Sequence, residues 1–266
     1  MSLAKPRRSI FADKLASHAD FASGDEAAFA RRGRWHDFFR GRLGDAFVGR
    51  TIVEIGCSDA ASLASMAVKH PHIGFIGIDW KAKQIFLGAE RVATLGLQNV
   101  ALLRARAQDM PLIFTEAEVD ELLIFHPEPF DRPEEIANRL IAEPFLQVAG
   151  AVLADAGIVA VKTDDVGYYQ SMLALFGIEP PDWHALAQTT RLRAADLVDP
   201  ADLPPPSEAL RRLYEVAAFS SDFWHDDALL AHTASRCFAG EVTLFEQRFV
   251  RKRQPIFYLE LRRRQR

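Results

Sequence analysis

The sequence predicts an α/β fold, in which a mainly parallel sheet is covered by helices on both faces and closed by an antiparallel pair of strands. Short apolar segments alternate with helical periodicity through the middle of the chain, as in parallel sheets. Residues 51–80 read as strand, tight turn, helix and strand, and the second strand ends in Asp79. Near the C-terminus, Val242–Val250 and Ile256–Leu261 flank a turn at Lys252–Pro255 and predict the antiparallel pair.

The individual elements follow from apolar periodicity and from the residues that interrupt it. Gly96 is expected to end the helix before it, and the segment from Val119 is apolar enough to be buried on both faces. Strands are predicted at Thr51–Ile55, Ile73–Ile78, Asn99–Leu103, Val119–Phe125 and Gly157–Val161, and helices from the first turn to His70, at Ala82–Leu95, from about Pro133 to Val148, and at Val166–Phe176.

The 266 residues are expected to form an N-terminal helical, basic extension at 1–50 and a main domain at 51–266. The phenylalanines of the extension are expected to anchor it to the main domain. Within the main domain, residues from about 179 to 238 contain clustered prolines and aromatics, and predict a partly helical insertion.

Charge is distributed unevenly along the chain. Residues 1–50 carry 10 Lys/Arg and 6 Asp/Glu, and residues 246–266 carry 8 Lys/Arg and 2 Asp/Glu. Residues 51–245, in contrast, carry 14 Lys/Arg and 28 Asp/Glu. An acidic body with two basic ends favours an anionic partner held by the ends. The last arginines, Arg262–Arg264 and Arg266, are expected to form a solvated tail. The arginines expected to bind the partner are Arg31, Arg32, Arg34, Arg40, Arg42 and those within Arg248–Arg253.

Composition excludes several classes of protein. Apolar residues make up 49% of the chain, which is typical of globular proteins, and no apolar segment is long enough to span a bilayer. We therefore expect a cytoplasmic protein with no membrane contact. Cys57 and Cys237 give neither a disulfide framework nor a zinc spacing, so no metal is expected. The oligomeric state stays open.

The turn after the first strand predicts a nucleoside site. Gly56, Ser58 and Ala60 are small, so the backbone can approach a ligand closely, and the following helix presents free N–H groups there. Asp79 lies about 20 residues further on, at the tip of the next strand, where an acid can accept hydrogen bonds from a ribose diol. An ordinary turn of another α/β protein remains the alternative.

Three further motifs follow later strands. Glu128 lies between Pro127 and Pro129 directly after a strand, where ligands of open α/β sheets bind. Asp164 begins the helix after the next strand, and Thr243-Leu244-Phe245-Glu246 stands near the C-terminus. A charged loop residue and a helix cap are the alternatives for Glu128 and Asp164.

In this order, the motifs resemble those of the bacterial tRNA (guanine-N7) methyltransferase family. E-I-G-C-S-D-A from Glu54 is similar to the E-x-G-x-G-x-G of class I methyltransferases, and F-H-P-E-P-F, T-D-D-V-G-Y and T-L-F-E are similar to F-F-P-D-P-W, T-D-x-x-x-Y and T-x-F-E. The resemblance covers about Thr51–Phe176 and Thr243 to the end. It implies a class I (Rossmann-like) methyltransferase fold, S-adenosylmethionine as cofactor, and methylation of guanosine N7 in tRNA.

The resemblance also implies a role for each matching residue. Glu128 stands where the family has the aspartate between methyl donor and base, and Asp109 substitutes, after a small shift, for the family acid that aligns with Arg106. The implied cofactor residues are Glu54, Gly56, Ser58, Ala60, Asp79 and Asp109, and the implied substrate residues are Arg132, Asp164, Thr243 and Glu246.

Departures from the family pattern keep two other functions open. Glu replaces Asp at 128, Phe130 replaces Trp, and an acidic segment follows where the family is basic. The alternatives are a class I methyltransferase acting on a small molecule or another nucleic acid, and a non-catalytic binding protein. Methylation of guanine N7, the leading hypothesis, is chemically simple. Guanine N7 has a free lone pair, so the reaction needs alignment with the methyl donor more than a strong base.

Overall fold

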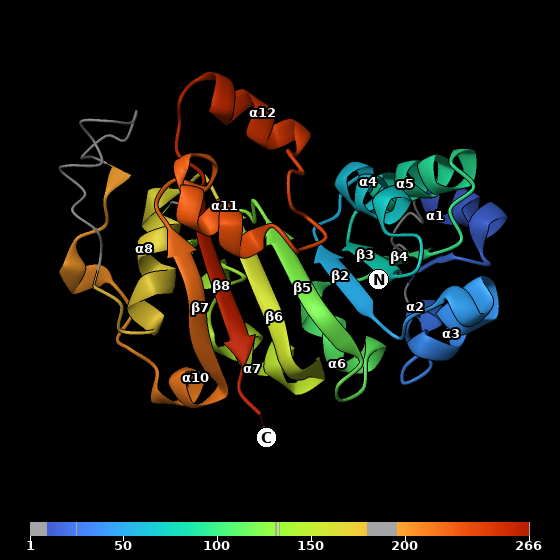
Figure 1. Ribbon diagram of the computed structural model, residues 1–266, viewed down its shortest axis with the longest axis horizontal. Coiled ribbons are helices and arrows are strands. Elements are labelled where there is room, and N and C mark those ends of the chain that lie inside the picture. The colour runs from blue at the N-terminus through green and yellow to red at the C-terminus, as the bar shows by residue number, and fades with distance from the viewer. Residues whose placement is uncertain (1–9, 25, 131, 133, 180–195, 266) are drawn as a thin grey trace, which may run out of the picture. The chain divides into compact units, whose positions relative to one another are not determined.

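The structure, a computed structural model, describes residues 10–24, 26–130, 132, 134–179 and 196–265, and Figure 1 shows their helices and strands. The chain divides into two compact units, Met1–Phe114 and Thr115–Arg266. Each unit is an α/β layer with its own strands and helices, and each is described by itself.

The first unit contains four strands in the order β1-β4-β3-β2, all paired in parallel. Helix α5 packs against β3 and β4, and α1 packs on α5. The elements are α1 (Ile10–Lys14), β1 (Ala22–Gly24), α2 (Glu26–Phe29), α3 (Trp35–Leu43), β2 (Thr51–Ile55), α4 (Ala61–Lys69), β3 (Gly74–Asp79), α5 (Ala82–Thr94), β4 (Val100–Arg104) and α6 (Met110–Ile113).

Aromatic side chains from the first 50 residues are built into the core of this unit. Phe39 and Trp35 are fully buried, and the Trp35 indole donates to the Ile113 carbonyl at 2.9 Å. A Cβ at Gly74 would lie 2.3 Å from the Phe39 ring, so only glycine lets α3 pack this closely on β3. The predicted anchoring role of the phenylalanines is confirmed, and Ala22–Gly24 additionally supplies a strand to the sheet.

The second unit has the strand order β5-β6-β8-β7. Strands β5 and β6 are parallel, whereas β8 runs antiparallel to both β6 and β7, so the predicted mainly parallel sheet with an antiparallel C-terminal pair is confirmed. The elements are β5 (Val119–Phe125), α7 (Glu143–Val152), β6 (Leu153–Thr163), α8 (Val166–Leu175), α10 (Glu208–Leu213), β7 (Tyr214–Ser220), α11 (Asp227–Thr233), α12 (Leu244–Arg251) and β8 (Phe257–Arg263).

The first member of the antiparallel pair lies elsewhere than predicted. Residues Leu244–Arg251 form helix α12, and the strand that pairs with β8 is β7. The reason is a capping box at the start of α12: the Thr243 hydroxyl accepts from the Glu246 N–H at 3.0 Å, and the Glu246 carboxylate accepts from the Thr243 N–H at 2.7 Å. Two helix-starting hydrogen bonds therefore override the strand-like apolar content of this segment.

The predicted helix from about Pro133 to Val148 is also wrong in part; Pro133 itself lies outside the described residues. The structure has a short 3-10 turn at Ile136–Asn138 and begins α7 only at Glu143. Between them, the Arg139 side chain donates to the Pro129 carbonyl at 2.7 Å and to Ser171 Oγ at 2.8 Å. Pro144 then starts a new helix, since it has no N–H with which to continue one.

Parts of the predicted insertion and tail belong to the sheet. Strand β7 lies within the segment 179–238, of which residues 180–195 are outside the described part of the chain. The expectation of a solvated tail is wrong for two arginines in β8: Arg262 pairs with Glu215 at 2.9 Å, and buried Arg263 pairs with Asp155 at 2.6 Å. Arg266 lies outside the described residues.

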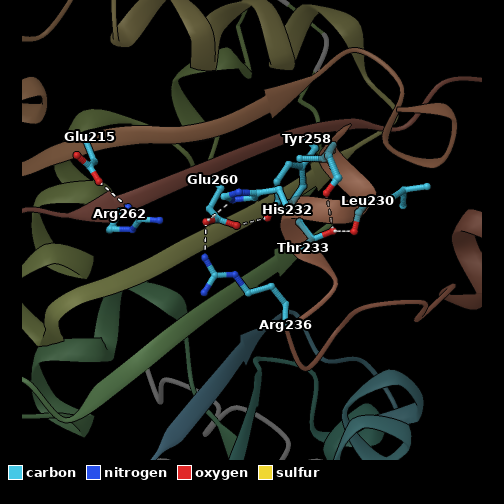
Figure 2. A network of polar contacts seen from close by, with 9 residues as sticks. Glu215, Leu230, His232, Thr233, Arg236, Tyr258, Glu260 and Arg262 are labelled. Carbon is cyan, nitrogen blue, oxygen red and sulfur yellow. Dashed lines mark hydrogen bonds and ion pairs between the residues drawn. The ribbon is translucent and has the colours of Figure 1, made fainter. Parts of the chain in front are cut away.

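Figure 2 shows how a buried carboxylate ties α11 and the residues after it to the sheet. Glu260 on β8 is fully buried and accepts from Arg236 at 2.5 Å and from the Tyr258 hydroxyl at 2.7 Å. His232 of α11 lies 3.2 Å from the same carboxylate. Because a buried charge needs partners, these three contacts fix the segment that covers this face.

We expect the two carboxylates drawn in Figure 2 to differ sharply in their effect on stability. Glu260→Ala should lower the free energy of unfolding by about 3–5 kcal/mol, because it leaves buried cationic and hydroxyl groups without their acceptor. Glu215→Ala, the matched control in a part-exposed pair, should cost about 1 kcal/mol or less. Urea unfolding followed by circular dichroism measures both, and equal losses would contradict the assignment.

Candidate functional site

The first unit holds a turn whose backbone is left-handed at alternate residues. The φ angles are 78° at Gly56, 51° at Ser58 and 54° at Ala60. The N–H groups of Gly56 and Cys57 both donate to the Ile78 carbonyl, at 2.8 and 3.2 Å. These bonds fold the turn over the tip of β3, with Gly56 and Ser58 exposed.

Asp79, at the end of β3, connects this strand to the turn that follows β2. Its carboxylate accepts from the Ser58 N–H at 3.2 Å and from the Lys81 N–H at 2.8 Å. A carboxylate has about four acceptor positions, so these two bonds orient it and leave capacity for a further donor. The side chain is half-buried, and it therefore fits the predicted role of binding a ribose diol.

A pocket of about 300 Å³ lies within the first unit at the ends of β3 and β4. Asp109, a predicted cofactor residue, lines it and is oriented by accepting from the Arg106 N–H at 3.0 Å. Trp80 is 62% exposed and offers an indole face suited to a purine. The lining residues are Glu26, Phe29, Trp80, Arg104, Ala105, Arg106 and Asp109.

Sequence reasoning did not assign Trp80, Glu26 or Phe29 to this site. Trp80 could have been found, because it directly follows the acid at the tip of β3, whereas α2 is brought to the pocket only by the fold. Glu54 lies in β2 and is 5% exposed. Burial, with Glu54 and Asp79 adding to it, raises the pKa of the Cys57 thiol well above its ordinary value, so this thiol is neutral.

In the second unit, the predicted residues Glu128 and Asp164 follow the neighbouring parallel strands β5 and β6. The His126 N–H donates to the Lys162 carbonyl at 2.7 Å and continues the pairing by one residue. Both acids therefore lie at the same edge of this sheet, Glu128 exposed and Asp164 with 28% of its side chain exposed. Arg132 is exposed in the loop beyond Glu128.

The cap of α8 is Asp165 and not Asp164. The Asp165 carboxylate accepts from the Tyr168 N–H at 2.6 Å. Asp164 instead contacts the His126 ring, with Oδ1 at 3.2 Å from Nδ1. Arg139 joins the loop that contains Glu128 to α8, because its guanidinium donates to the carbonyls of Pro129 and Gly167.

His126 and Lys162 bring α12 to these strand tips. The Lys162 ammonium lies 3.1 Å from Glu246 Oε1, and both side chains are fully buried. His126 Nε2 lies 4.0 Å from the same oxygen. The predicted substrate residues Thr243 and Glu246 form the capping box of α12, and Glu246 has one oxygen on Lys162 and the other on the Thr243 N–H.

These contacts shift the pKa values of the cluster. Burial opposes the charged imidazole, but the hydrogen bond to Asp164 and the negative charge of nearby Glu246 raise the pKa of His126. Burial also opposes the Glu246 carboxylate, yet His126, Lys162 and the Thr243 N–H lower its pKa to about 2. Burial lowers the pKa of Lys162, and Glu246 counteracts it. The site thus consists of exposed Glu128 and part-buried Asp164 beside a buried cluster of His126, Lys162 and Glu246.

The chain has the fold of class I methyltransferases. The structure of the 16S rRNA methyltransferase KamB superposes with a TM-score of 0.53 at 15% sequence identity, covering 86% of this chain and 92% of that one. The predicted fold class is therefore confirmed.

A protein-family model described as "Putative methyltransferase" matches residues 49–198, and the chain belongs to this family. It is 28% identical to the tRNA (guanine-N(7)-)-methyltransferase of Geobacillus kaustophilus, over 60% of this chain and 70% of that protein. It is 32% identical to the protein of the same name from Porphyromonas gingivalis, over 56% of this chain and 59% of that protein. The expected resemblance is confirmed, and the chain is an S-adenosylmethionine-dependent methyltransferase.

The described part of the chain contains neither a candidate metal site nor a candidate membrane-spanning helix. Among its residues, no group of three or more His, Cys, Asp or Glu side chains could hold a metal ion. None of the described helices is long and apolar enough to cross a membrane.

We expect the cluster around His126 to make stability depend on pH. Because the folded-state pKa of His126 is raised, its stabilisation is complete below its ordinary pKa of about 6.5 and is lost as the pH rises through the folded value. The loss should be about 1.4 kcal/mol for each unit by which the folded pKa exceeds the ordinary one. Urea unfolding between about pH 6 and 9 measures it.

The matched control is His225→Gln, which changes an exposed histidine that also pairs with an acid. This variant should keep the fall in stability with pH, whereas His126→Gln should remove it. A flat profile for the unmodified protein would show that folding does not raise the pKa of His126.

Proposed function

We propose that this enzyme methylates N7 of a guanosine in tRNA, with S-adenosylmethionine as the methyl donor. The observation that carries the proposal is the position of Asp79 and Asp164 at the tips of β3 and β6. Both lie in motifs that resemble those of the guanine-N7 methyltransferase family, and the chain is 28% and 32% identical to two proteins named for this reaction. The proposed partner is tRNA, and a tRNA substrate implies a cytoplasmic enzyme.

The cofactor-binding residues of the proposal are those of the first unit. The turn Gly56–Ala60 admits the ligand to the backbone, Asp79 accepts from the ribose hydroxyls, and the pocket containing Trp80 and Asp109 receives the adenine. The bound cofactor supplies an electrophilic methyl group on its sulfonium. Glu54, buried in β2, stays a candidate for the cofactor's cationic end.

The substrate-binding residues of the proposal are those of the second unit. Guanine N1–H and N2–H are donors, and the carboxylates of exposed Glu128 and part-buried Asp164 are acceptors that match them. Arg132 is a candidate for a nearby phosphate. Thr243 and Glu246 contribute by holding α12, since their polar groups bind each other and Lys162.

The deciding experiment is transfer of a labelled methyl group to total tRNA, followed by analysis of the nucleosides. We expect N7-methylguanosine. Glu128→Gln should lower the rate of transfer while cofactor binding is kept, because Glu128 is assigned to the base. A labelled small molecule, or label in a different nucleoside, would favour the alternative methyltransferases, to which the acids Glu134 and Glu135 beyond the Glu128 loop lend support.

Cofactor binding is tested separately by calorimetry. Asp79→Asn should weaken it by at least about tenfold, because charge-assisted hydrogen bonds of roughly 1.5–3 kcal/mol are removed. Asp37→Asn, which changes an exposed acid of α3, is the matched control and should bind normally. If the unmodified protein binds no S-adenosylmethionine, the assignment of the turn is wrong.

Binding of tRNA should depend on the exposed arginines of the first unit and not on every arginine there. Arg42 is engaged with the Gln98 carbonyl at 2.9 Å and with Asp20 at 3.3 Å, whereas Arg34 and Arg40 are exposed. Arg34→Gln and Arg40→Gln should each lower the slope of the salt dependence by about one unit for every phosphate that the arginine neutralises. Binding that ignores salt would contradict the proposed partner.

A further inference from the structure

Helix α12 presents a basic surface with one exposed aromatic ring. Phe245 is 46% exposed although phenylalanine is usually buried. Four exposed cations follow it on the helix and in the turn after the helix, namely Arg248, Arg251, Lys252 and Arg253. Glu246 is the acid of this helix, and it is buried against Lys162, so the exposed side of α12 is strongly positive.

The exposed ring is held firmly by its neighbours. The centroid of the Phe245 ring lies 5.1 Å from that of His126 and 4.9 Å from that of Phe249. His126 is itself fixed between Asp164 and Glu246. Phe245 is therefore a preorganised ring with about half of its surface open, and it lies beside the tip of β5, above which Figure 1 shows α12.

We propose that Phe245 is a stacking platform for one unpaired base of the RNA, while the cations of α12 contact the phosphates beside that base. The proposal rests on the proposed function and adds to it the single-stranded character of the RNA at this point. Aromatic rings stack on unpaired bases whatever their sequence, and adjacent cations bind the backbone. Because Phe245 touches His126, the platform lies next to the acids assigned to the guanosine.

An anionic membrane surface is the other partner that a basic, aromatic helix could bind. The chemistry of α12 favours RNA. Its phenylalanines do not form one open apolar face, because Phe249 is half-buried against His126 and the inward position 246 is an acid. Vesicles are therefore included in the test as the competing outcome.

The test measures binding of the full chain to a fluorescent single-stranded RNA and to a blunt RNA duplex of the same length. We expect Phe245→Ala to weaken binding of the single strand by about five- to one-hundred-fold, and to change duplex binding little. Val250→Ala removes another exposed apolar side chain of α12 and is the matched control, which should bind both RNAs normally. Phe245→Trp should bind the single strand at least as tightly as the unmodified protein.

A second measurement separates stacking from a change in folding. An RNA with one 2-aminopurine at an unpaired position should lose fluorescence on binding to the unmodified protein and keep it on binding to Phe245→Ala. The urea midpoint of each variant shows whether α12 is intact. Equal affinity of Phe245→Ala and the unmodified protein for single-stranded RNA would overturn the proposal, and so would binding to phosphatidylserine vesicles that depends on Phe245.

The outcomes also separate this proposal from the proposed function. If methyl transfer yields N7-methylguanosine but Phe245→Ala binds single-stranded RNA normally, the platform is wrong and the enzymatic assignment stands. If Phe245 contributes to RNA binding but guanosine N7 is not methylated, the RNA surface stands and the reaction is wrong.

Discussion

The second unit depends on one buried ion pair, in which the Lys162 ammonium lies 3.1 Å from the Glu246 carboxylate and both side chains are fully buried. Taking two charges out of water is unfavourable, and good geometry with further partners must offset it. The Thr243 N–H supplies one partner to Glu246, and the Phe223 ring centroid lies 4.1 Å from the ammonium of Lys162. The pair joins β6 to α12, and removing either member would leave the other charged group buried without its main ionic partner.

Because of this ion pair, some residues of the sequence motifs stabilise the structure while others lie at the surface. Glu246 must face inward to reach Lys162, and successive helical residues differ in direction by about 100°, so its neighbour Phe245 faces outward. The T-L-F-E motif thus places one residue in the ionic cluster and one on the surface. Glu128 and Asp164 remain on the exposed side, where their carboxylates are available to a ligand. The T-L-F-E motif therefore acts here through helix capping, whatever it contributes to a ligand.

Much of the fold was predictable, because β2 and β5 have the bounds that apolar periodicity predicts and because parallel strands bring Asp79, Glu128 and Asp164 to strand tips. Errors arose where local signals competed. Residues 242–250 have strand-like apolar content, but the capping box at Thr243 decides for helix. The helix expected before Val148 was delayed by long-range hydrogen bonds of Arg139. Tertiary structure alone brings Trp80 close to α2 and Lys162 close to α12. Local sequence patterns do not predict such contacts.

The cofactor turn shows why a glycine motif can be met without all its glycines. Residues with a Cβ are disfavoured by roughly 1–2 kcal/mol each in the left-handed conformation that Ser58 and Ala60 adopt. Hydrogen bonds and packing compensate at each position. Asp79 accepts from the Ser58 N–H, and buried Ala60 packs against α5 at Gly88, where an added Cβ would lie 3.1 Å from that of Ala60. The requirement at these positions is therefore a small side chain and a tethered backbone, and Asp79, the acid proposed to bind the ribose, also tethers Ser58.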